Sequence, residues 1–256
     1  MEFGEIMLIE GQIQARTATS GMRYCPVEVY DRYFDALRLA SALGITVVEV
    51  AGNGASDLDA PISTNGITFR NVLSRNHTDF RDSGAIVVGG ATKGVPHERK
   101  EGFSDNTQTD FGSRIDAYSW FEGIYTTSLT SPTGYRDNFG GNSGASAIVA
   151  GVAALIQSMV QASLHFKLAP LQMRRLITMS GTPTRNPASD RIGLMPNLKG
   201  LIDDQYLNLA PDLYVRDVID DDGSPRAGNA TYASPDIITK QTGVANPGEQ
   251  FGSGSG

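Results

Sequence analysis

The 256-residue sequence contains one cysteine, three histidines and fewer basic than acidic residues. These shortages limit the structures, chemistry and partners that the sequence allows. Its single cysteine, Cys25, excludes an internal disulfide, and we interpret the thiol as a small semi-buried apolar group. No run of about 18 apolar residues is present, so no membrane-spanning segment is predicted, and the first residues lack the pattern of a signal peptide. The formal net charge of −7 argues against nucleic acid or an anionic membrane as a partner.

The most informative segment is Gly-Asn-Ser-Gly-Ala-Ser-Ala-Ile-Val-Ala-Gly, residues 141–151. Ser143 stands directly before small and apolar residues, 145–159, that predict a buried helix. A serine at a helix N-terminus lies among free backbone N–H groups and at the positive end of the helix dipole. An acyl-transfer enzyme needs its nucleophile in such a place, because the oxyanion forms within reach of those donors. The alternative is an ordinary N-cap, a position that favours serine and asparagine.

A second segment, residues 45–51, is a β-branched run that predicts a buried parallel strand. It follows a helical pattern over 29–43 that Gly44 ends, and it leads into Gly52-Asn53-Gly54. Ligands of open α/β sheets bind at the carboxyl ends of strands, so the Asn53 amide is placed to donate to an oxyanion. The alternative is a turn asparagine that adopts a positive φ before glycine.

Taken in order along the chain, these segments resemble the subtilisin-like serine peptidases, or subtilases. Residues 5–10 are similar to the family strand that forms one wall of the substrate cleft, and 82–90 to its next core strand. Residues 103–104 and then 111–117 resemble the stretch that leads to the serine, and 169–177 the helix after it. The resemblance spans residues 4–204. It implies a three-layer α/β fold, with a mainly parallel sheet and helices on both faces, that lacks the N-terminal strands.

The resemblance also implies the roles of individual residues. Ser143 matches the nucleophile and Asn53 the side-chain donor to the oxyanion. No cofactor or metal is implied. The residues that match the substrate-binding positions are Glu10, Gly11, Ala51 and Gly52.

Three positions depart from the family pattern. Asn142 precedes the serine where the family has threonine, and Ala147 stands four residues after it in place of proline. Neither change removes the nucleophile, because proline is only tolerated in a first helical turn. Glu10 replaces a small polar residue in the cleft wall, so the specificity pocket is not predicted.

The family's catalytic Asp and His are missing from this sequence. Subtilases order the triad and its oxyanion donor as Asp, His, Asn, Ser, which places both before Asn53, and neither motif occurs. His77 and His97 fall in polar stretches between Asn53 and Ser143. His165 follows Ser143 by 22 residues, about 33 Å along one helix, so it cannot be the base. Loss of the histidine costs about 10⁶ in turnover, or about 8 kcal/mol, a figure that belongs to subtilisin itself.

We therefore expect residues 1–206 to be the C-terminal portion of a subtilase catalytic domain, inactive alone. A peptide or protein is the expected substrate, and a complementing N-terminal segment, upstream or on a second chain, would carry Asp and His. The alternative is a non-catalytic peptide-binding module that keeps the cleft. An α/β-hydrolase is excluded, since it needs an acid and a histidine after the serine and His165 shares the serine's helix. Extracellular action is suggested by the family alone.

Residues 207–256 are predicted to start a β module followed by a linker. Two short strands are expected, at 212–217 and 234–239, and two strands alone are marginal in water. Asp220–Asp222 between them is either a calcium site or a solvated acidic loop. Asp57 and Asp59, which follow Asn53, either serve a metal or a charged substrate or lie in a polar surface loop. The chain ends in Gly252–Gly256, which has the composition of a flexible linker. We therefore expect both ends to be truncation points of a longer polypeptide.

Overall fold

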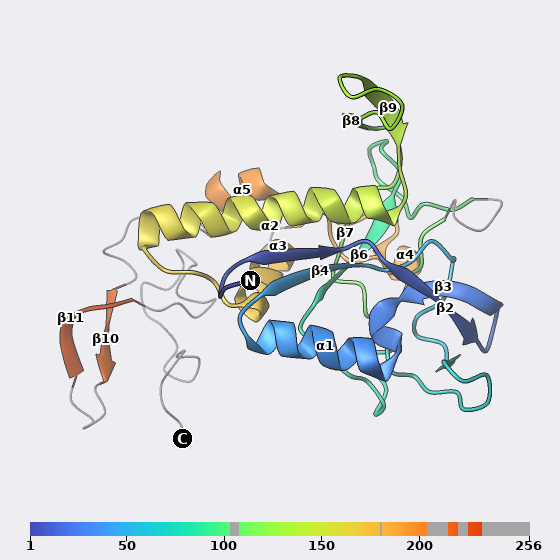
Figure 1. Ribbon diagram of the computed structural model, residues 1–256, viewed down its shortest axis with the longest axis horizontal. Helices are drawn as coiled ribbons and strands as arrows, with labels where there is room; N and C mark the ends of the chain where they lie inside the picture. The colour runs from blue at the N-terminus through green and yellow to red at the C-terminus, as the bar shows by residue number, and fades with distance from the viewer. Residues whose placement is uncertain (103–107, 180, 204–214, 220–224, 232–256) are drawn as a thin grey trace.

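A four-stranded parallel sheet forms the centre of the computed structural model, which describes residues 1–102, 108–179, 181–203, 215–219 and 225–231 (Figure 1). The strand order is β1 (Ile6–Ile9), β4 (Thr46–Val50), β6 (Ile86–Ala91), β7 (Ala117–Trp120). β4 and β6 are buried at every position. Parallel strands covered on both faces need such continuous apolar runs, and the strands predicted within 45–51 and 82–90 are confirmed.

Helices cover both faces of this sheet. In Figure 1, α2 (Asn142–Leu164) crosses above the strands and α1 (Asp31–Ala42) lies below them. α3 (Pro170–Met179) and α5 (Leu198–Asp203) pack on the α2 side, where Leu176 and Leu201 are fully buried. The three-layer α/β fold expected from the resemblance is therefore confirmed.

α2 is the main core helix and is longer than the predicted 145–159. Its buried residues recur every three or four positions, so they form one stripe against β4, β6 and β7. α2 carries no Asp, Glu, Lys or Arg. By length and composition alone it is the one described helix that could cross a membrane; its contacts with all four central strands make it a core helix here. The buried stripe consists of Ala145, Val149, Ala153, Ile156, Val160 and Leu164.

Smaller antiparallel units flank the central sheet. β2 (Gln12–Thr17) pairs with β3 (Gly21–Pro26) and with the short β5 (Ile62–Ser63). β8 (Ile124–Thr127) and β9 (Tyr135–Phe139) form a hairpin that stands out from the body near the start of α2 in Figure 1. The short helices η1 (Val27–Val29) and α4 (Pro187–Asp190) lie in connections.

The structure describes only part of the region in which two C-terminal strands are predicted. β10 (Val215–Ile219) overlaps the predicted strand 212–217 and pairs antiparallel with β11 (Pro225–Thr231). β11 was not predicted from the sequence, because Thr231 is its only β-branched residue. Asp220–Asp222, residues 234–239 and Gly252–Gly256 lie outside the described residues, as does the domain boundary at 206, which stays a prediction.

A buried ion-pair cluster ties the segment before α1 to the sheet. Arg114 is fully buried, with its Nε 2.5 Å from Glu28 Oε1 and its Nη1 2.7 Å from Asp116 Oδ2. Glu49 of β4 accepts the Glu28 backbone N–H at 3.0 Å, and burial raises its pKa well above the usual range. Charges placed in the interior need such partners, so the cluster fixes how η1 and the strands meet.

Candidate active site

Ser143 lies in the first turn of α2, as the sequence predicts. Gly141 is the N-cap residue with a φ of +89°, a conformation that suits glycine. The Gly141 N–H donates to the Phe121 carbonyl at 2.7 Å, and a Cβ at Gly140 would lie 2.3 Å from that oxygen. The two glycines therefore allow a sharp entry into the helix. Ser143 is half-buried, and no described residue hydrogen-bonds its hydroxyl.

Asn53 meets the start of α2 from the carboxyl end of β4. Its Oδ1 accepts the Asn142 backbone N–H at 3.0 Å, and Asn142 Nδ2 donates to the Gly52 carbonyl at 2.5 Å. A Cβ built on Gly141 would lie 3.6 Å from Asn53 Nδ2 and 3.9 Å from the Ser143 nitrogen. Two donors, the side-chain amide and the Ser143 backbone N–H, therefore border the same space before the helix.

Asp110 holds the Asn53 turn in place, and sequence reasoning missed it. Its Oδ1 accepts the backbone N–H groups of Gly54 at 2.9 Å and Ser56 at 2.8 Å, and its own N–H donates to the Gly52 carbonyl at 2.9 Å. The carboxyl group is fully buried, its Oδ2 has no partner among the described residues, and burial raises its pKa well above the usual range. A carboxyl in such surroundings favours the neutral form.

Gly52 shows how closely Asp110 approaches the turn. Gly52 has a φ of +116°, and a Cβ there would lie 2.4 Å from Asp110 Oδ2. Only a residue without a side chain fits this position. The available sequence signal was the polar Thr109-Asp110 pair, which stands directly before the matched residues 111–117.

The four predicted substrate-binding residues divide into two pairs. Ala51 and Gly52 are buried at the end of β4, and the Ala51 N–H donates to the Val88 carbonyl at 2.9 Å. Glu10 and Gly11 are exposed where β1 ends. Gln12 Oε1 accepts the Asn53 N–H at 2.8 Å, so the Glu10–Gln12 connection reaches the same edge of the sheet. Their roles toward a substrate stay predictions.

None of the three histidines is hydrogen-bonded to Ser143 in the described structure. His165 is the C-cap of α2, at the opposite end of the helix. His97 is largely buried, with its Nδ1 2.9 Å from the Thr92 carbonyl and its ring edge-to-face with Tyr118. His77 is exposed and its Nδ1 accepts the Asp79 N–H at 3.1 Å. A general base must lie within hydrogen-bond reach of the proton that it removes, and these rings are held elsewhere.

The acidic pair after Asn53 is engaged with the protein itself. Arg191 donates to Asp57 at 2.9 Å and to Asp59 at 2.7 Å, and the Ser113 hydroxyl donates to Asp59. Among the described residues, no group of three or more His, Cys, Asp or Glu side chains is placed to hold a metal ion. These contacts favour the structural interpretation of Asp57 and Asp59.

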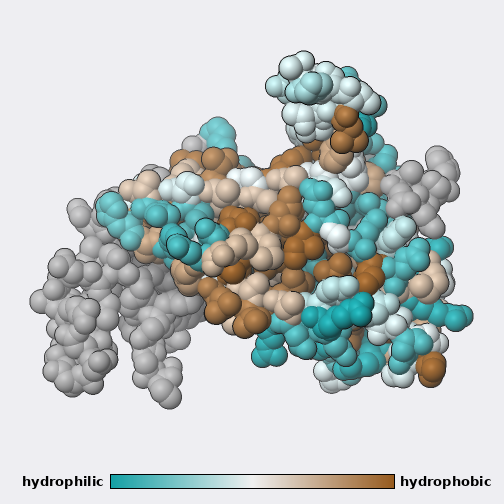
Figure 2. Space-filling view, viewed as in Figure 1, coloured by the Kyte–Doolittle hydropathy of each residue, from teal (hydrophilic) through white to brown (hydrophobic). Residues whose placement is uncertain are grey.

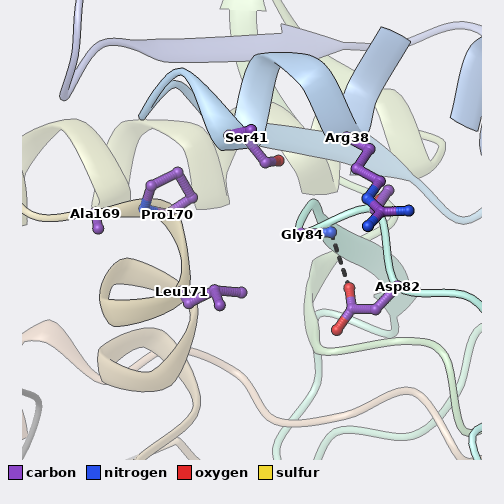
Figure 3. Close-up of a pocket in the computed structure, with 9 residues that line it drawn as sticks. Arg38, Ser41, Asp82, Gly84, Ala169, Pro170 and Leu171 are labelled. Atoms are coloured by element: carbon purple, nitrogen blue, oxygen red, sulfur yellow. Dashed lines mark hydrogen bonds between the residues drawn. The ribbon is translucent and has the colours of Figure 1, made fainter. Parts of the chain in front are cut away.

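A separate cavity of about 370 Å³ lies at the amino end of β6, away from the serine. Figure 3 shows Arg38 and Ser41 of α1 on one side and Pro170 of α3 on another. Asp82, in its wall, accepts the Gly84 N–H at 2.8 Å and pairs with Arg174. Ligands of α/β sheets bind at the carboxyl ends of the strands, so the Asn53 edge remains the candidate site.

The structure is a three-layer α/β fold in which the candidate nucleophile, Ser143, lies at the N-terminus of a core helix. The family model for the subtilases matches residues 19–195. The chain belongs to the subtilase family of serine peptidases, and the resemblance seen in its sequence is confirmed.

Solved structures show the same fold at low identity. The patellamide maturation protease PatA is 19% identical with a TM-score of 0.50, and the match covers 77% of this chain and 61% of that one. The A-subunit of the AB5 toxin from E. coli is 16% identical with a TM-score of 0.54, covering 78% and 59%. This chain therefore spans about three-fifths of the length of these structures. The comparison with curated proteins gave no match.

Proposed function

We propose that Ser143 is the nucleophile of a subtilisin-type serine endopeptidase. Its Oγ attacks the carbonyl carbon of the scissile peptide bond, and its proton passes to a histidine that residues 1–256 do not supply. The amine leaves with that proton, and an acyl-enzyme on Ser143 remains. Water then hydrolyses the acyl-enzyme and returns the proton to the serine.

The contact between Asn53 and the start of α2 carries this proposal. Because Asn53 Oδ1 accepts from Asn142, the other end of the amide, Nδ2, is left to donate at the space beside Ser143. The Ser143 backbone N–H adds a second donor at the positive end of the helix dipole. Preorganised donors of this kind stabilise the tetrahedral intermediate of acyl transfer. The alternative of an ordinary N-cap does not describe Ser143, because Gly141 is the N-cap residue and Ser143 lies inside α2.

The peptidase needs an acid and a base from additional polypeptide, and we propose that residues 1–256 alone do not turn over substrate. The described structure gives the Ser143 hydroxyl no partner, so nothing there removes its proton. The substrate is a peptide or protein, and Glu10 and Gly11 border it at the end of β1.

The second candidate function is a peptide-binding module without chemistry. The observation in its favour is that the Ser143 hydroxyl has no hydrogen-bond partner among the described residues. A module that only binds peptide does not need a base next to this serine. It predicts saturable peptide binding that Ser143→Ala leaves unchanged.

One experiment separates the two functions. The product of the longest reading frame that contains residues 1–256 is assayed for hydrolysis of fluorogenic casein. Under the peptidase proposal it carries the Asp and His motifs and cuts, Ser143→Ala abolishes hydrolysis, and Ser189→Ala, at an exposed serine of α4, leaves it intact. A product that has both motifs and cuts nothing contradicts the peptidase. A product without them that binds peptide supports the binding module.

A further inference from the structure

The cavity at the amino end of β6, which we call the β6 cavity, plays no part in the proposed reaction. It has a volume of about 370 Å³, and its walls are mostly apolar. Figure 3 shows that the walls come from the end of α1, the start of α3 and the residues that lead into β6. Small-molecule sites are usually cavities of about 300–1,000 Å³ with apolar walls and a few polar groups. The apolar residues of the wall are Ala42, Ala169, Pro170 and Leu171.

Arg38 places a positive charge at one side of the β6 cavity. In Figure 3 it lies on the same side as Asp82, across from Pro170 and Leu171. Asp82 is already matched, because its two oxygens accept from Arg174 at 2.8 and 2.6 Å. Arg38 makes no ion pair with a described residue. An exposed arginine near the carboxyl end of a helix also suits the helix dipole, so this charge alone does not define a site.

Ser41 adds a polar group without a partner to the same wall. Its Oγ is buried, and no described residue hydrogen-bonds it. In Figure 3 the hydroxyl points toward the side that holds Arg38. A Cβ built at Gly84 would lie 2.8 Å from this oxygen, so only glycine leaves room beside it. A buried polar group without a partner costs about 1–3 kcal/mol, and the hydroxyl is therefore a second, independent sign of a ligand.

The charges around the β6 cavity select the kind of ligand. Arg174 and Asp82 cancel each other, so Arg38 leaves one positive charge. α3 begins at Pro170 in the wall, and the first N–H groups of a helix lack intrahelical partners and favour an anion. A cation would be repelled by Arg38, and a neutral ligand would leave its charge unmatched. The walls therefore fit a molecule with an apolar body and a single negative charge.

We propose that the β6 cavity binds a small apolar monocarboxylate, either a free acid or the C-terminal residue of a peptide. The carboxylate accepts hydrogen bonds from the Arg38 guanidinium and the Ser41 hydroxyl, and the apolar body packs against Pro170 and Leu171. Hydrogen bonds to an ionised group are about twice as strong as those between neutral groups, so the carboxylate contributes much of the affinity. The proposal does not depend on the role of Ser143.

Calorimetric titration of residues 1–256 with octanoate tests the proposal. We expect saturable binding to one site. Octanamide has the same apolar chain without the charge, and it should bind at least about 10-fold more weakly, a difference of ~1.4 kcal/mol. N-acetylleucine presents the carboxylate on a peptide-like body. Tighter binding of N-acetylleucine assigns the site to a peptide C-terminus, and tighter binding of octanoate assigns it to a free acid.

Variants of the cavity wall locate the binding site. Arg38→Gln should weaken octanoate binding at least about 10-fold and leave octanamide binding unchanged, because it removes only the charge. Arg16→Gln removes the same charge at an exposed position of β2 and is the matched control. Ser41→Ala should weaken octanoate binding about 3–10-fold without lowering the melting temperature of the free protein, since its Oγ has no partner to lose. Ala42→Phe fills the cavity from an exposed position and should weaken the binding of both compounds.

Other apolar surfaces of the molecule also attract an alkyl chain, so the charge dependence decides the outcome. Figure 2 shows hydrophobic residues across the middle of the face between α1 and α2 of Figure 1, and a cavity of about 400 Å³ is lined by Met7 and Leu37. Octanoate binding that Arg38→Gln leaves unchanged would assign the acid to such a surface and overturn the proposal. Equal affinities for octanoate and octanamide, or no saturable binding of octanoate or N-acetylleucine, would overturn it as well.

Discussion

Asp110 is expected to control the stability of the Asn53 turn, and its removal should be costly. Its Oδ1 is the acceptor for two buried backbone N–H groups, those of Gly54 and Ser56. An orphaned buried donor costs about 1–3 kcal/mol, so Asp110→Ala should lower the free energy of unfolding by about 2–6 kcal/mol. Asp110→Asn keeps an acceptor oxygen at this position and should lose much less.

The same carboxyl gives a pH signature that the asparagine variant removes. Burial raises the pKa of Asp110 in the folded protein, whereas in the unfolded chain it is about 3.9. Between the two values the folded state holds a proton that the unfolded state has released. The Asp110 contribution to stability is therefore full below about pH 3.9 and is lost as the pH rises toward the folded pKa, at about 1.4 kcal/mol per pH unit.

Equilibrium urea unfolding from pH 4 to pH 8 measures both effects. As the pH rises through that window, the parent should lose stability that Asp110→Asn keeps. The free energy of unfolding of the variant minus that of the parent should therefore increase. Asp137→Asn, at an exposed position of the β9 strand, serves as the control and should show no such trend. A pH-independent difference for Asp110→Asn, or a loss below about 1 kcal/mol for Asp110→Ala, would refute the reasoning.

Three further predictions concern the core and the oxyanion donor. Arg114→Met leaves Glu28 buried without its partner and should destabilise the protein by about 3–5 kcal/mol in urea unfolding; Arg114→Lys should not restore stability fully, because it lacks the bidentate fork. Cys25 is buried, and burial raises the pKa of its thiol, so dithionitrobenzoate should react with it only on unfolding; rapid reaction of the native protein would contradict its burial. Asn53→Ala should lower casein turnover of the complete peptidase about 10²–10³-fold, the loss known for subtilisin's own asparagine, with the fold retained by circular dichroism.

The sequence was sufficient for the central sheet and for the position of Ser143. Residues 45–51 and 145–159 are apolar enough to identify a buried strand and a core helix, and glycines mark both turns at the site. The ordered match to the subtilases then allowed Asn53 and Ser143 to be paired, although 90 residues separate them. Their contact through Asn142 is seen only in the structure.

Long-range partners could not be predicted. Asp110 lies 56 residues from the Gly54 N–H that it accepts, and Arg114 lies 86 from Glu28. The residues next to Asp110 and Arg114 in the sequence do not show whether these charged side chains are buried or exposed. Their burial depends on contacts with segments that are distant in the sequence. The antiparallel β2–β3 pair was also missed, although Gln12–Thr17 alternates polar with apolar residues, the pattern that indicates a half-buried strand.

Covalent labelling of Ser143 tests the central claim most directly. Residues 1–256 are incubated with a fluorophosphonate, with and without the additional polypeptide proposed to supply the acid and base, and the peptide that contains Ser143 is analysed by mass spectrometry. The account predicts an adduct on Ser143 in the mixture and none on residues 1–256 alone. A stable complex in which Ser143 stays unlabelled would contradict the claim that this serine is a peptidase nucleophile.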